Sequence, residues 1–335
     1  MKTKTKDKPY CGVRKNMMVE AEPEIDEKAL KLLSQFVTER YRIHIRKDIQ
    51  CLQPPFTKDP ILKEFKFTNI RREHDRETKW LINNITSNDF LTYRQKLLNC
   101  ILFRLYNKHE TMEIIGAPYK FEGVWSFVSP REKVVKYSQE NPKYTWFTNA
   151  FITGGMKLSL KRTYTKETVV AALPLRFMKT LNESDLFNKI QACKTQKQVY
   201  DTLKGVYGLG DFLAYQIFVD FTYINEFPFS ENEFTVAGPG CKKGLDCLFK
   251  DRDGMTYEEC LFWLRDHWDY IPISYKFSRW FDPEKEMVDL KHYDRVMNVM
   301  SLENCFCEFS KYYRAYHDTG RPRNKYKFDA KKEPI

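Results

Sequence analysis

Apolar residues recur at spacings of three and four along much of the chain, which is the pattern of amphipathic helices. The clearest case is the stretch 25–49, where this spacing runs from Leu30 to Tyr41. The Pro54–Pro55 pair that follows predicts the end of this helix.

The same spacing predicts further helices, whereas strand-like alternation is scarce and short. The first two of these predicted helices cover 71–84 and the span from an N-cap at Ser87–Asp89 through Leu105. The others cover 166–181, 184–193, 196–204, the span from Thr256 through Trp268, and 293–316. Residues 116–165 are rich in aromatic residues, Gly and Pro and are less regular.

These patterns predict a mainly α fold with few short strands. We expect a single compact helical domain at 25–320, between a basic N-terminal tail at 1–24 and a basic C-terminal tail at 321–335. The hydrophobic share of 42% and the aromatic share of 15% supply a core and exclude wholesale disorder.

The net charge of +11 suggests a polyanionic partner, but its distribution changes this interpretation. Residues 1–15 contribute +5 and residues 321–335 contribute +4, which leaves +2 for the 305 residues between them. The tails act either as solvated extensions or as an auxiliary grip on nucleic acid. Residues that would recognise a DNA substrate must therefore be sought between the two tails.

Other features bear on location and metals. No apolar run approaches the roughly 18–20 residues that cross a bilayer, and no apolar stretch follows the basic N-terminus, so we expect a cytoplasmic protein without a membrane partner. The nine cysteines are scattered and odd in number, which predicts reduced thiols. Neither they nor the six histidines form a zinc pattern, so no metal is expected.

A glycine-rich turn lies between two predicted helices, in the sequence GVYGLGDF at 205–212. Gly208 and Gly210 allow backbone amides to face a phosphate, and the next helix N-terminus adds partial positive charge. The arrangement resembles the helix–hairpin–helix of base-excision DNA glycosylases. An ordinary tight turn between helices is the alternative.

Acidic residues follow this turn at the distance where such glycosylases carry a catalytic acid. Asp220 lies in the apolar stretch QIFVDFTYI, where a carboxylate must be either functional or paired, for example with an arginine. Glu231 and Glu233 border the next loop, and they are either functional or simply exposed.

The next loop has the sequence AGPGCKKG at 237–244. Gly238 and Gly240 around a proline predict a bent backbone, and Lys242 and Lys243 would close over an anion such as phosphate or pyrophosphate. A surface turn with solvated lysines is the alternative. The motif GxxxxGK[ST] is absent from the sequence, which argues against an autonomous kinase.

An arginine-rich segment at 67–80 is flanked by aromatic residues that anchor it to the core. As a helix it would place Arg72, Arg76 and Lys79 on one face, either for phosphate recognition or as a solvated, ion-paired surface. The candidates for binding a phosphate group, such as one released in a reaction, are Arg71, Arg72 and Arg76, with Asn69 and Asp75 to orient them.

The C-terminal helix places Lys311 and Arg314 on one face, and basic and aromatic residues continue through Arg321, Arg323 and Tyr326. This mixture suits a phosphodiester backbone with bases to stack on. Cys307 in this helix is better explained as a buried thiol than as a nucleophile, because no histidine lies nearby in sequence.

Four segments together resemble one phage-associated family: FTNIRREHDRETKWL, FRLYNKHET, GLGDFLAYQIFVDFTY through GPGCKKG, and ENCFCEFSKYYRAY. The chain is similar over about 30–325 to the helical domain of the 5-hydroxymethyluracil-DNA kinase group. That group includes the α-glutamyl/putrescinyl thymine pyrophosphorylases, or amino-acid:DNA transferases. The chain departs from the glycosylase pattern in one respect: the acid expected after the hairpin does not stand in a V-D-T-H-like sequence. The nearest match is Glu233 in SENEFTV.

The resemblance implies a transferase that acts on double-stranded DNA after a separate P-loop kinase has activated 5-hydroxymethyluracil. An amino acid or polyamine co-substrate would displace the phosphate or pyrophosphate, with no tightly bound cofactor. We expect Asp220, or else Glu233, to be the base, and Tyr207 or Tyr223 to hold the target base after it has flipped out of the duplex. The alternatives are a DNA glycosylase and a non-catalytic DNA-binding module that recruits the kinase.

Overall fold

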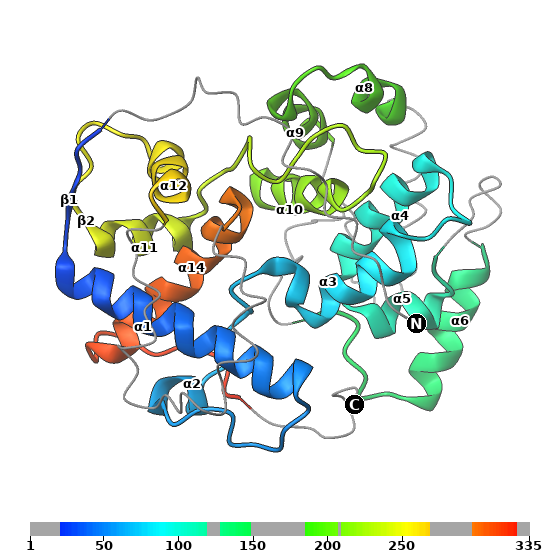
Figure 1. Cartoon of the computed structure of the whole chain (residues 1–335). Coiled ribbons are helices and arrows are strands. Elements are labelled where there is room, and N and C mark those ends of the chain that lie inside the picture. Colours follow the sequence, from blue (N-terminus) through cyan, green and yellow to red (C-terminus); the bar gives the residue numbers. More distant parts are fainter. Residues whose placement is uncertain (1–20, 119–127, 149–184, 207–208, 269–296, 327–335) are drawn as a thin grey trace, which may run out of the picture. The chain divides into compact units, whose positions relative to one another are not determined.

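The computed structural model describes residues 21–118, 128–148, 185–206, 209–268 and 297–326 (Figure 1). Helices dominate these residues, and the two short strands β1 (Glu24–Ile25) and β2 (Phe249–Asp251) pair antiparallel. The predicted mainly α fold class is confirmed. None of the helices in these ranges combines the length and the apolar character that a membrane crossing requires.

The chain divides into two compact units. Unit 1 joins the N-terminal part, Met1–Phe67, to the C-terminal part, Pro239–Ile335, and unit 2 is the continuous stretch Thr68–Gly238. The predicted domain limits at 24 and 320 stay predictions. Residues 324–326 at the start of the predicted C-terminal tail pair with residues 64–66, through Lys66 N to Asn324 O at 2.9 Å and Tyr326 N to Glu64 O at 2.8 Å.

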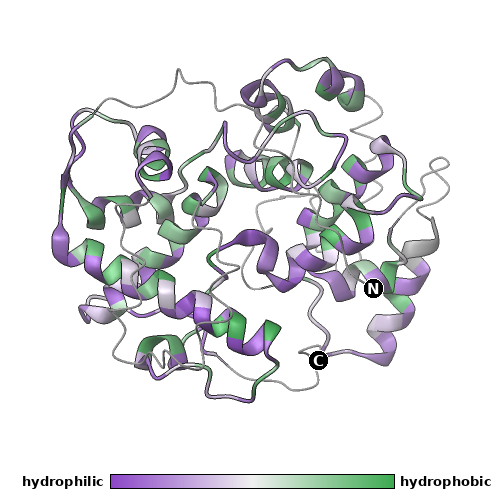
Figure 2. Ribbon diagram, in the orientation of Figure 1, coloured by the Kyte–Doolittle hydropathy of each residue, from purple (hydrophilic) through white to green (hydrophobic). Residues whose placement is uncertain are grey.

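In unit 1, α1 (Glu27–His44) confirms the helix predicted at the N-terminus of the body, and a π-helical turn (Ile45–Ile49) extends it. Asp26 caps α1 by accepting hydrogen bonds from the backbone N–H groups of Lys28 and Ala29. The apolar side of α1, visible in Figure 2, packs against α14 (Val299–Tyr316). Phe36 of α1 contacts Tyr312 of α14 with ring centroids 5.0 Å apart.

The prediction of a bent loop at 237–244 is wrong from Pro239 onward, because these residues begin the helix α11 (Pro239–Leu248), and anion binding by Lys242 and Lys243 stays a prediction. Proline is tolerated at the first position of a helix, where its missing N–H costs nothing. Gly240 and Gly244, one turn apart, face α14 instead of a ligand: a Cβ on Gly244 would lie 2.9 Å from the carbonyl carbon of Phe306. The glycines therefore allow two helices to approach closely.

The remaining elements of unit 1 are short. α2 (Pro60–Glu64) is capped by Asp59, and α12 (Tyr257–Asp266) begins at Thr256 as predicted, with a reciprocal pair of hydrogen bonds between Thr256 and Glu259.

Unit 2 is built around α10 (Asp211–Thr222), which packs against α4 (Tyr93–Tyr106) and α9 (Gln196–Lys204). Every residue of α10 from Ala214 to Thr222 is buried. The other elements are α3 (Arg76–Leu81) with a π-helical turn (Ile82–Thr86), α5 (His109–Ile115), α6 (Val128–Glu140) and α8 (Leu186–Ala192).

The helix predicted at 71–84 is not continuous, and this corrects the expected single face of basic residues. A 3₁₀ turn (Arg72–His74) precedes α3, and Asp75 between them is extended, with φ −69° and ψ 139°. The reason is local: Asp75 Oδ1 accepts the backbone N–H of Asn69 at 2.8 Å, and Asn69 Nδ2 donates to the His74 carbonyl at 2.9 Å. Asn69 and Asp75 thus hold the backbone of the arginine-rich segment.

The N-cap predicted at Ser87–Asp89 lies too early. Thr92 caps α4. Its side-chain oxygen accepts a hydrogen bond from the backbone N–H of Gln95, and the backbone N–H of Thr92 donates to the side chain of Gln95. The helix predicted at 196–204 coincides with α9. The helix predicted at 166–181, and residues 293–296 of the last predicted helix, lie outside the described residues.

Candidate functional site

Asp220 is fully buried in α10, and Arg104 of α4 holds both of its oxygens. Arg104 Nε lies 2.5 Å from Oδ2 and Nη2 lies 2.6 Å from Oδ1. Burial raises the pKa of the Asp220 carboxyl, and the charges of Arg104 and Arg72 oppose this rise. Of the two roles that the sequence left open, this geometry fits the arginine-paired carboxylate. A general base must reach its substrate, and a carboxylate with no exposed surface does not.

Arg72 joins the arginine-rich segment to α10. Its side chain is buried, and Nη2 donates to Oε1 of Gln216, one turn before Asp220. A guanidinium in this position stabilises the contact between the segment and α10 and is poorly placed to meet a phosphate from solvent. The neighbouring Arg71, whose side chain is 14% exposed, lies 3.6 Å from Glu73.

Tyr223 ends α10 and lies within the electrostatic reach of several charged groups. Burial, followed by the charges of Glu231 and Glu73, raises the pKa of Tyr223 well above its ordinary value. Arg72 and Asp220 also act on this hydroxyl. Three residues that the sequence assigned to separate roles, Arg72, Asp220 and Tyr223, therefore come together at one end of α10.

Glu233, the second predicted base, is exposed on the segment that follows α10. Gln196 Nε2 donates to Glu233 Oε2 at 3.1 Å and to the Ser230 carbonyl at 2.9 Å, which anchors this segment to α9. The Tyr215 and Thr235 hydroxyls, 2.9 Å apart, anchor it to α10.

The predicted hairpin lies between α9 and α10, which pack against each other. Gly208 and Tyr207 lie outside the described residues, and Gly210 is exposed immediately before α10. Asp211, in the first turn of α10, is paired with Lys204 at 2.5 Å. A helix–hairpin–helix of the glycosylase type stays a prediction.

The basic residues predicted to bind phosphate or DNA in unit 1 lie on two helices and in the segment that follows. Lys242 and Lys243 are exposed on α11, where Lys242 Nζ lies 5.2 Å from the Tyr257 ring centroid. On α14, Lys311 is paired with Glu308, and Arg314 Nε donates to the Ser310 carbonyl. Arg321 and Arg323 are exposed. Gly238 is the last residue of unit 2.

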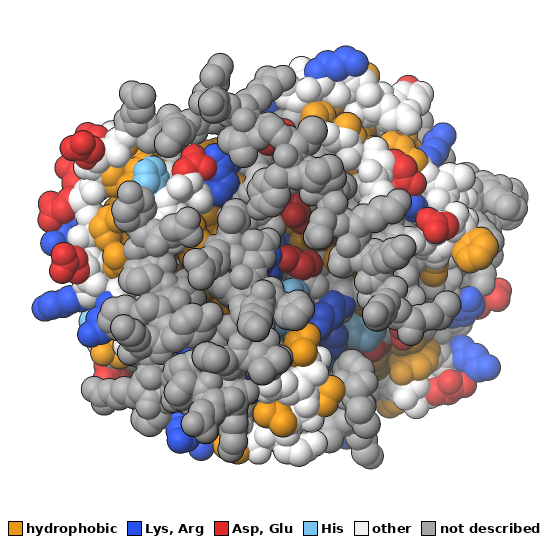
Figure 3. Space-filling view, in the orientation of Figure 1, with side chains coloured by type: hydrophobic (Ala, Val, Ile, Leu, Met, Phe, Trp, Pro, Cys, Tyr) orange, Lys and Arg blue, Asp and Glu red, His pale blue; other side chains and the backbone are white. Residues whose placement is uncertain are grey.

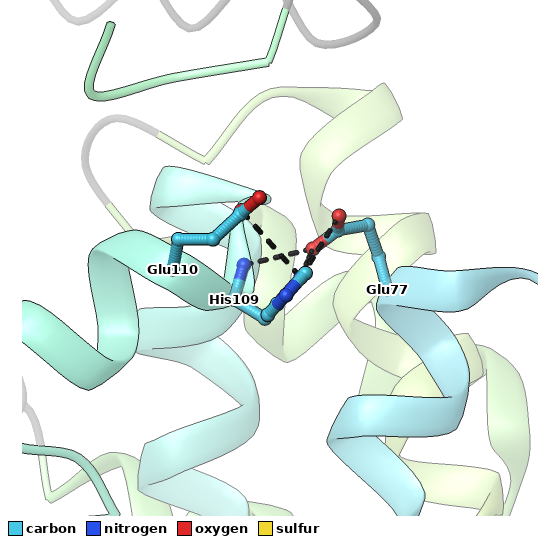
Figure 4. Close-up of side chains that lie close together, drawn as sticks. All are labelled: Glu77, His109 and Glu110. Atoms are coloured by element: carbon cyan, nitrogen blue, oxygen red, sulfur yellow. Dashed lines mark hydrogen bonds and ion pairs between the residues drawn. The ribbon is translucent and has the colours of Figure 1, made fainter. Parts of the chain in front are cut away.

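A second polar cluster in unit 2, which the sequence did not reveal, joins Glu77 of α3 to His109 and Glu110 of α5 (Figure 4). The backbone N–H of His109 donates to Glu77 Oε2 at 2.8 Å. His109 Nδ1 lies 3.1 Å from both oxygens of Glu77 and 3.5 Å from Oε2 of Glu110. Thirty-two positions separate Glu77 from His109, so no local spacing could have indicated the cluster.

Arg76 borders this cluster, with Nη2 2.9 Å from Oε1 of Glu77 and 3.9 Å from Oε1 of Glu110. Although burial opposes both shifts, the bond between Glu77 and His109 lowers the pKa of Glu77 and raises that of His109. The side chain of Arg76 is 41% exposed, so this guanidinium is open to solvent while Glu77 orients it. On the face shown in Figure 3, side chains of both charge signs lie scattered among apolar and uncharged ones.

Comparisons with known proteins agree with the sequence resemblance. The family described as "5-hmdU DNA kinase, helical domain" matches residues 27–321. A protein of Bacillus phage SP10 called 5-hmdU DNA kinase is 24% identical over 319 residues, which are 90% of this chain and 47% of the relative. The chain thus spans about half the length of that relative. No solved structure matches. The chain belongs to the family of 5-hmdU DNA kinase helical domains.

Proposed function

We propose that this chain takes part in modifying 5-hydroxymethyluracil in DNA, as the transferase that joins an amino acid or polyamine to the activated hydroxymethyl group. The observation that carries the proposal is the family match over residues 27–321, which includes both the arginine-rich segment and α10. The SP10 relative is called a 5-hmdU DNA kinase, and this chain, without a GxxxxGK[ST] motif, aligns with about half of it. A step in the same DNA chemistry other than ATP-dependent phosphorylation fits these facts.

In the proposed reaction, the amine nitrogen attacks the exocyclic methylene carbon attached to C5 of the uracil. A C–N bond forms while the C–O bond to the phosphate or pyrophosphate breaks, and the leaving group departs with the bonding electrons. The nitrogen also loses one proton. The site must therefore stabilise a departing polyanion and accept a proton.

For the leaving group, Arg76 is the best placed of the predicted arginines. Its guanidinium is partly exposed and oriented by Glu77, which is the arrangement that suits bidentate recognition of a phosphate. Arg71 is the second candidate. Arg72 is a positioning residue in this proposal, because its buried side chain links the segment to Gln216.

For the proton, Glu233 replaces Asp220 as the first choice. Its carboxylate is exposed and lies on a segment that Gln196 holds in place. Tyr223 is proposed to contact the target base. DNA contacts by Gly210, Lys311, Arg314, Arg321 and Arg323, and an anion contact by Lys242 and Lys243, remain part of the proposal.

The test uses the full chain and a DNA duplex whose 5-hydroxymethyluracil has been phosphorylated or pyrophosphorylated beforehand. The duplex is incubated with ¹⁵N-labelled amino acids and putrescine, digested to nucleosides and analysed by mass spectrometry. We expect a nucleoside that carries the amine, together with release of the leaving group. Arg76→Ala should lower the rate by about 10²-fold, the usual loss when one charge-stabilising donor is removed. Lys197→Ala, at an exposed lysine of α9 paired with Asp201, is the control and should leave the rate unchanged.

Two outcomes would contradict the proposal. Abasic sites in the product would identify a glycosylase, since a transferase leaves the glycosidic bond intact. Binding of the activated duplex without consumption of the ester would identify a non-catalytic module. A non-catalytic DNA-binding module is the second candidate function, because this chain covers 47% of a relative that is called a kinase.

A further inference from the structure

We propose that Glu77, His109 and Glu110 form a binding site for one divalent metal ion of the kind that accepts both imidazole and carboxylate ligands, such as Mn²⁺ or Zn²⁺. The three side chains offer one nitrogen and two carboxylate oxygens, all within 4.8 Å of one another. A mixed nitrogen and oxygen donor set of this type favours first-row transition metals and zinc.

The spacing of the donors is compatible with a shared ion in place of the hydrogen bonds that join Glu77 to His109. Ligands at about 2.0–2.2 Å from a metal leave neighbouring donor atoms about 3.0–3.5 Å apart in octahedral or tetrahedral geometry. The measured separations from His109 Nδ1 are 3.1 Å to both Glu77 oxygens and 3.5 Å to Oε2 of Glu110. A charge-assisted hydrogen bond, in contrast, is usually about 2.7–2.9 Å long and directed at one oxygen.

One buried carboxylate oxygen, Oε2 of Glu110, accepts no hydrogen bond from the described residues, and its contact with His109 Nδ1 is a longer one of 3.5 Å. His109 Nδ1, the nearest donor, carries at most one proton, and that proton already faces both oxygens of Glu77. A buried carboxylate oxygen without a donor is costly, and a cation between the three side chains would remove the cost.

The surrounding contacts hold the ligands in place. The backbone N–H of His109 donates to Glu77, and Trp80 Nε1 of α3 donates to Glu113 Oε1 of α5 at 2.8 Å. Trp80 stacks on Phe103 of α4 with ring centroids 5.7 Å apart. The helices α3 and α5 are therefore fixed to one another independently of any ion, as a preformed site requires.

The role of the ion rests on the proposed function, whereas the existence of the site does not. An ion held here would lie next to Arg76, which contacts Glu77. A divalent cation beside an arginine suits the oxygens of a phosphate or pyrophosphate leaving group.

The experiment is a titration of the full chain, freed of metal by a chelator, with Mn²⁺ alone, without DNA or amine. Free Mn²⁺ is measured by electron paramagnetic resonance. Mn²⁺ is chosen because it prefers nitrogen and oxygen over the free cysteines of this chain. We expect one bound ion per chain. The affinity of Glu110→Gln for Mn²⁺ should be at least about 10-fold weaker, because removal of a metal ligand weakens binding at least as much as removal of a hydrogen bond that supports a ligand.

The matched control is Glu113→Gln on the same helix. The amide oxygen keeps the bond from Trp80, so Mn²⁺ binding should equal that of the wild type. His109→Ala should abolish Mn²⁺ binding. If His109→Ala does not fold, Glu110→Gln still tests the site, since glutamine has the same shape as glutamate. The proposal is overturned if the wild type binds no Mn²⁺ at millimolar concentration or if Glu110→Gln binds as well as the wild type. Because the substrate is absent, neither result depends on the transferase activity.

Discussion

Among the described residues of unit 2, the pair of Arg104 and Asp220 and the cluster of Glu77, His109 and Glu110 differ in how completely their charges are satisfied. In the pair of Arg104 and Asp220, one guanidinium holds both carboxylate oxygens at 2.5 and 2.6 Å, and Asp220 has no exposed surface. In the cluster of Glu77, His109 and Glu110, the contacts of Nδ1 are 3.1–3.5 Å long, and Oε2 of Glu110 accepts no hydrogen bond from the residues that the structure describes. Burial alone therefore does not mark a functional carboxylate: the closed pair is suited to stabilise the fold, and the open cluster is the one for which we propose ion binding.

The largest effect should come from breaking the closed pair. Asp220→Asn leaves the Arg104 guanidinium buried without a counter-charge, so the free energy of unfolding should fall by about 3–5 kcal/mol. Urea denaturation followed by circular dichroism measures this change. Glu233→Gln, at an exposed carboxylate, is the control and should unfold like the wild type. If Asp220→Asn keeps full stability but loses transferase activity, Asp220 has a catalytic role after all.

A smaller effect is expected at a pair of intermediate burial, Lys96 and Glu226. Lys96 Nζ lies 2.9 Å from Oε1 of Glu226. The Lys96 side chain is only 2% exposed, but the Glu226 side chain is 49% exposed, so solvent reaches the pair and screens the interaction. Glu226→Gln should therefore lower the free energy of unfolding by about 1 kcal/mol or less at neutral pH.

The pH dependence of this pair has a definite sign. Although burial raises the pKa of Glu226, the hydrogen bond from Lys96 lowers it below the ordinary value of 4.5. A carboxyl whose pKa is lowered on folding stabilises the protein above its unfolded pKa, and this contribution is lost as the pH falls through the folded pKa. The stability difference between the wild type and Glu226→Gln should be constant above about pH 5 and shrink in more acidic solution. A difference that grows on acidification would contradict this assignment.

The smallest stability effect is expected in the open cluster. Glu110→Gln removes a carboxylate whose buried oxygen accepts no bond from the described residues, so the free energy of unfolding without metal should change by no more than about 0.5 kcal/mol. Addition of Mn²⁺ should then raise the melting temperature of the wild type and not of the variant, because only the site that binds the ion gains stability from it. Thermal denaturation with and without Mn²⁺ measures both values. A large loss without metal would place Glu110 among the stabilising pairs.

Local sequence patterns predicted several elements well. Apolar spacing located α1 and α14, and capping chemistry at Thr256 located the start of α12. The pattern failed where a side chain bonded to the backbone in an unexpected way, as at Asp75, or where a reciprocal capping pair followed a few residues later, as at Thr92 and Gln95. The glycines of α11 were misread because a glycine that permits a bend and a glycine that permits close helix contact look the same in sequence.

The helical class, the concentration of positive charge in the terminal segments and the family resemblance all follow from the amino-acid sequence, because they depend on composition and local spacing. Which charged residues meet depends on how the helices pack. Asp220 finds Arg104 at a sequence separation of 116, and His109 finds Glu77 at a separation of 32. The physical reason is that the state of a carboxylate depends on its burial and on the donors around it, and both are set by helices that lie far apart in the chain.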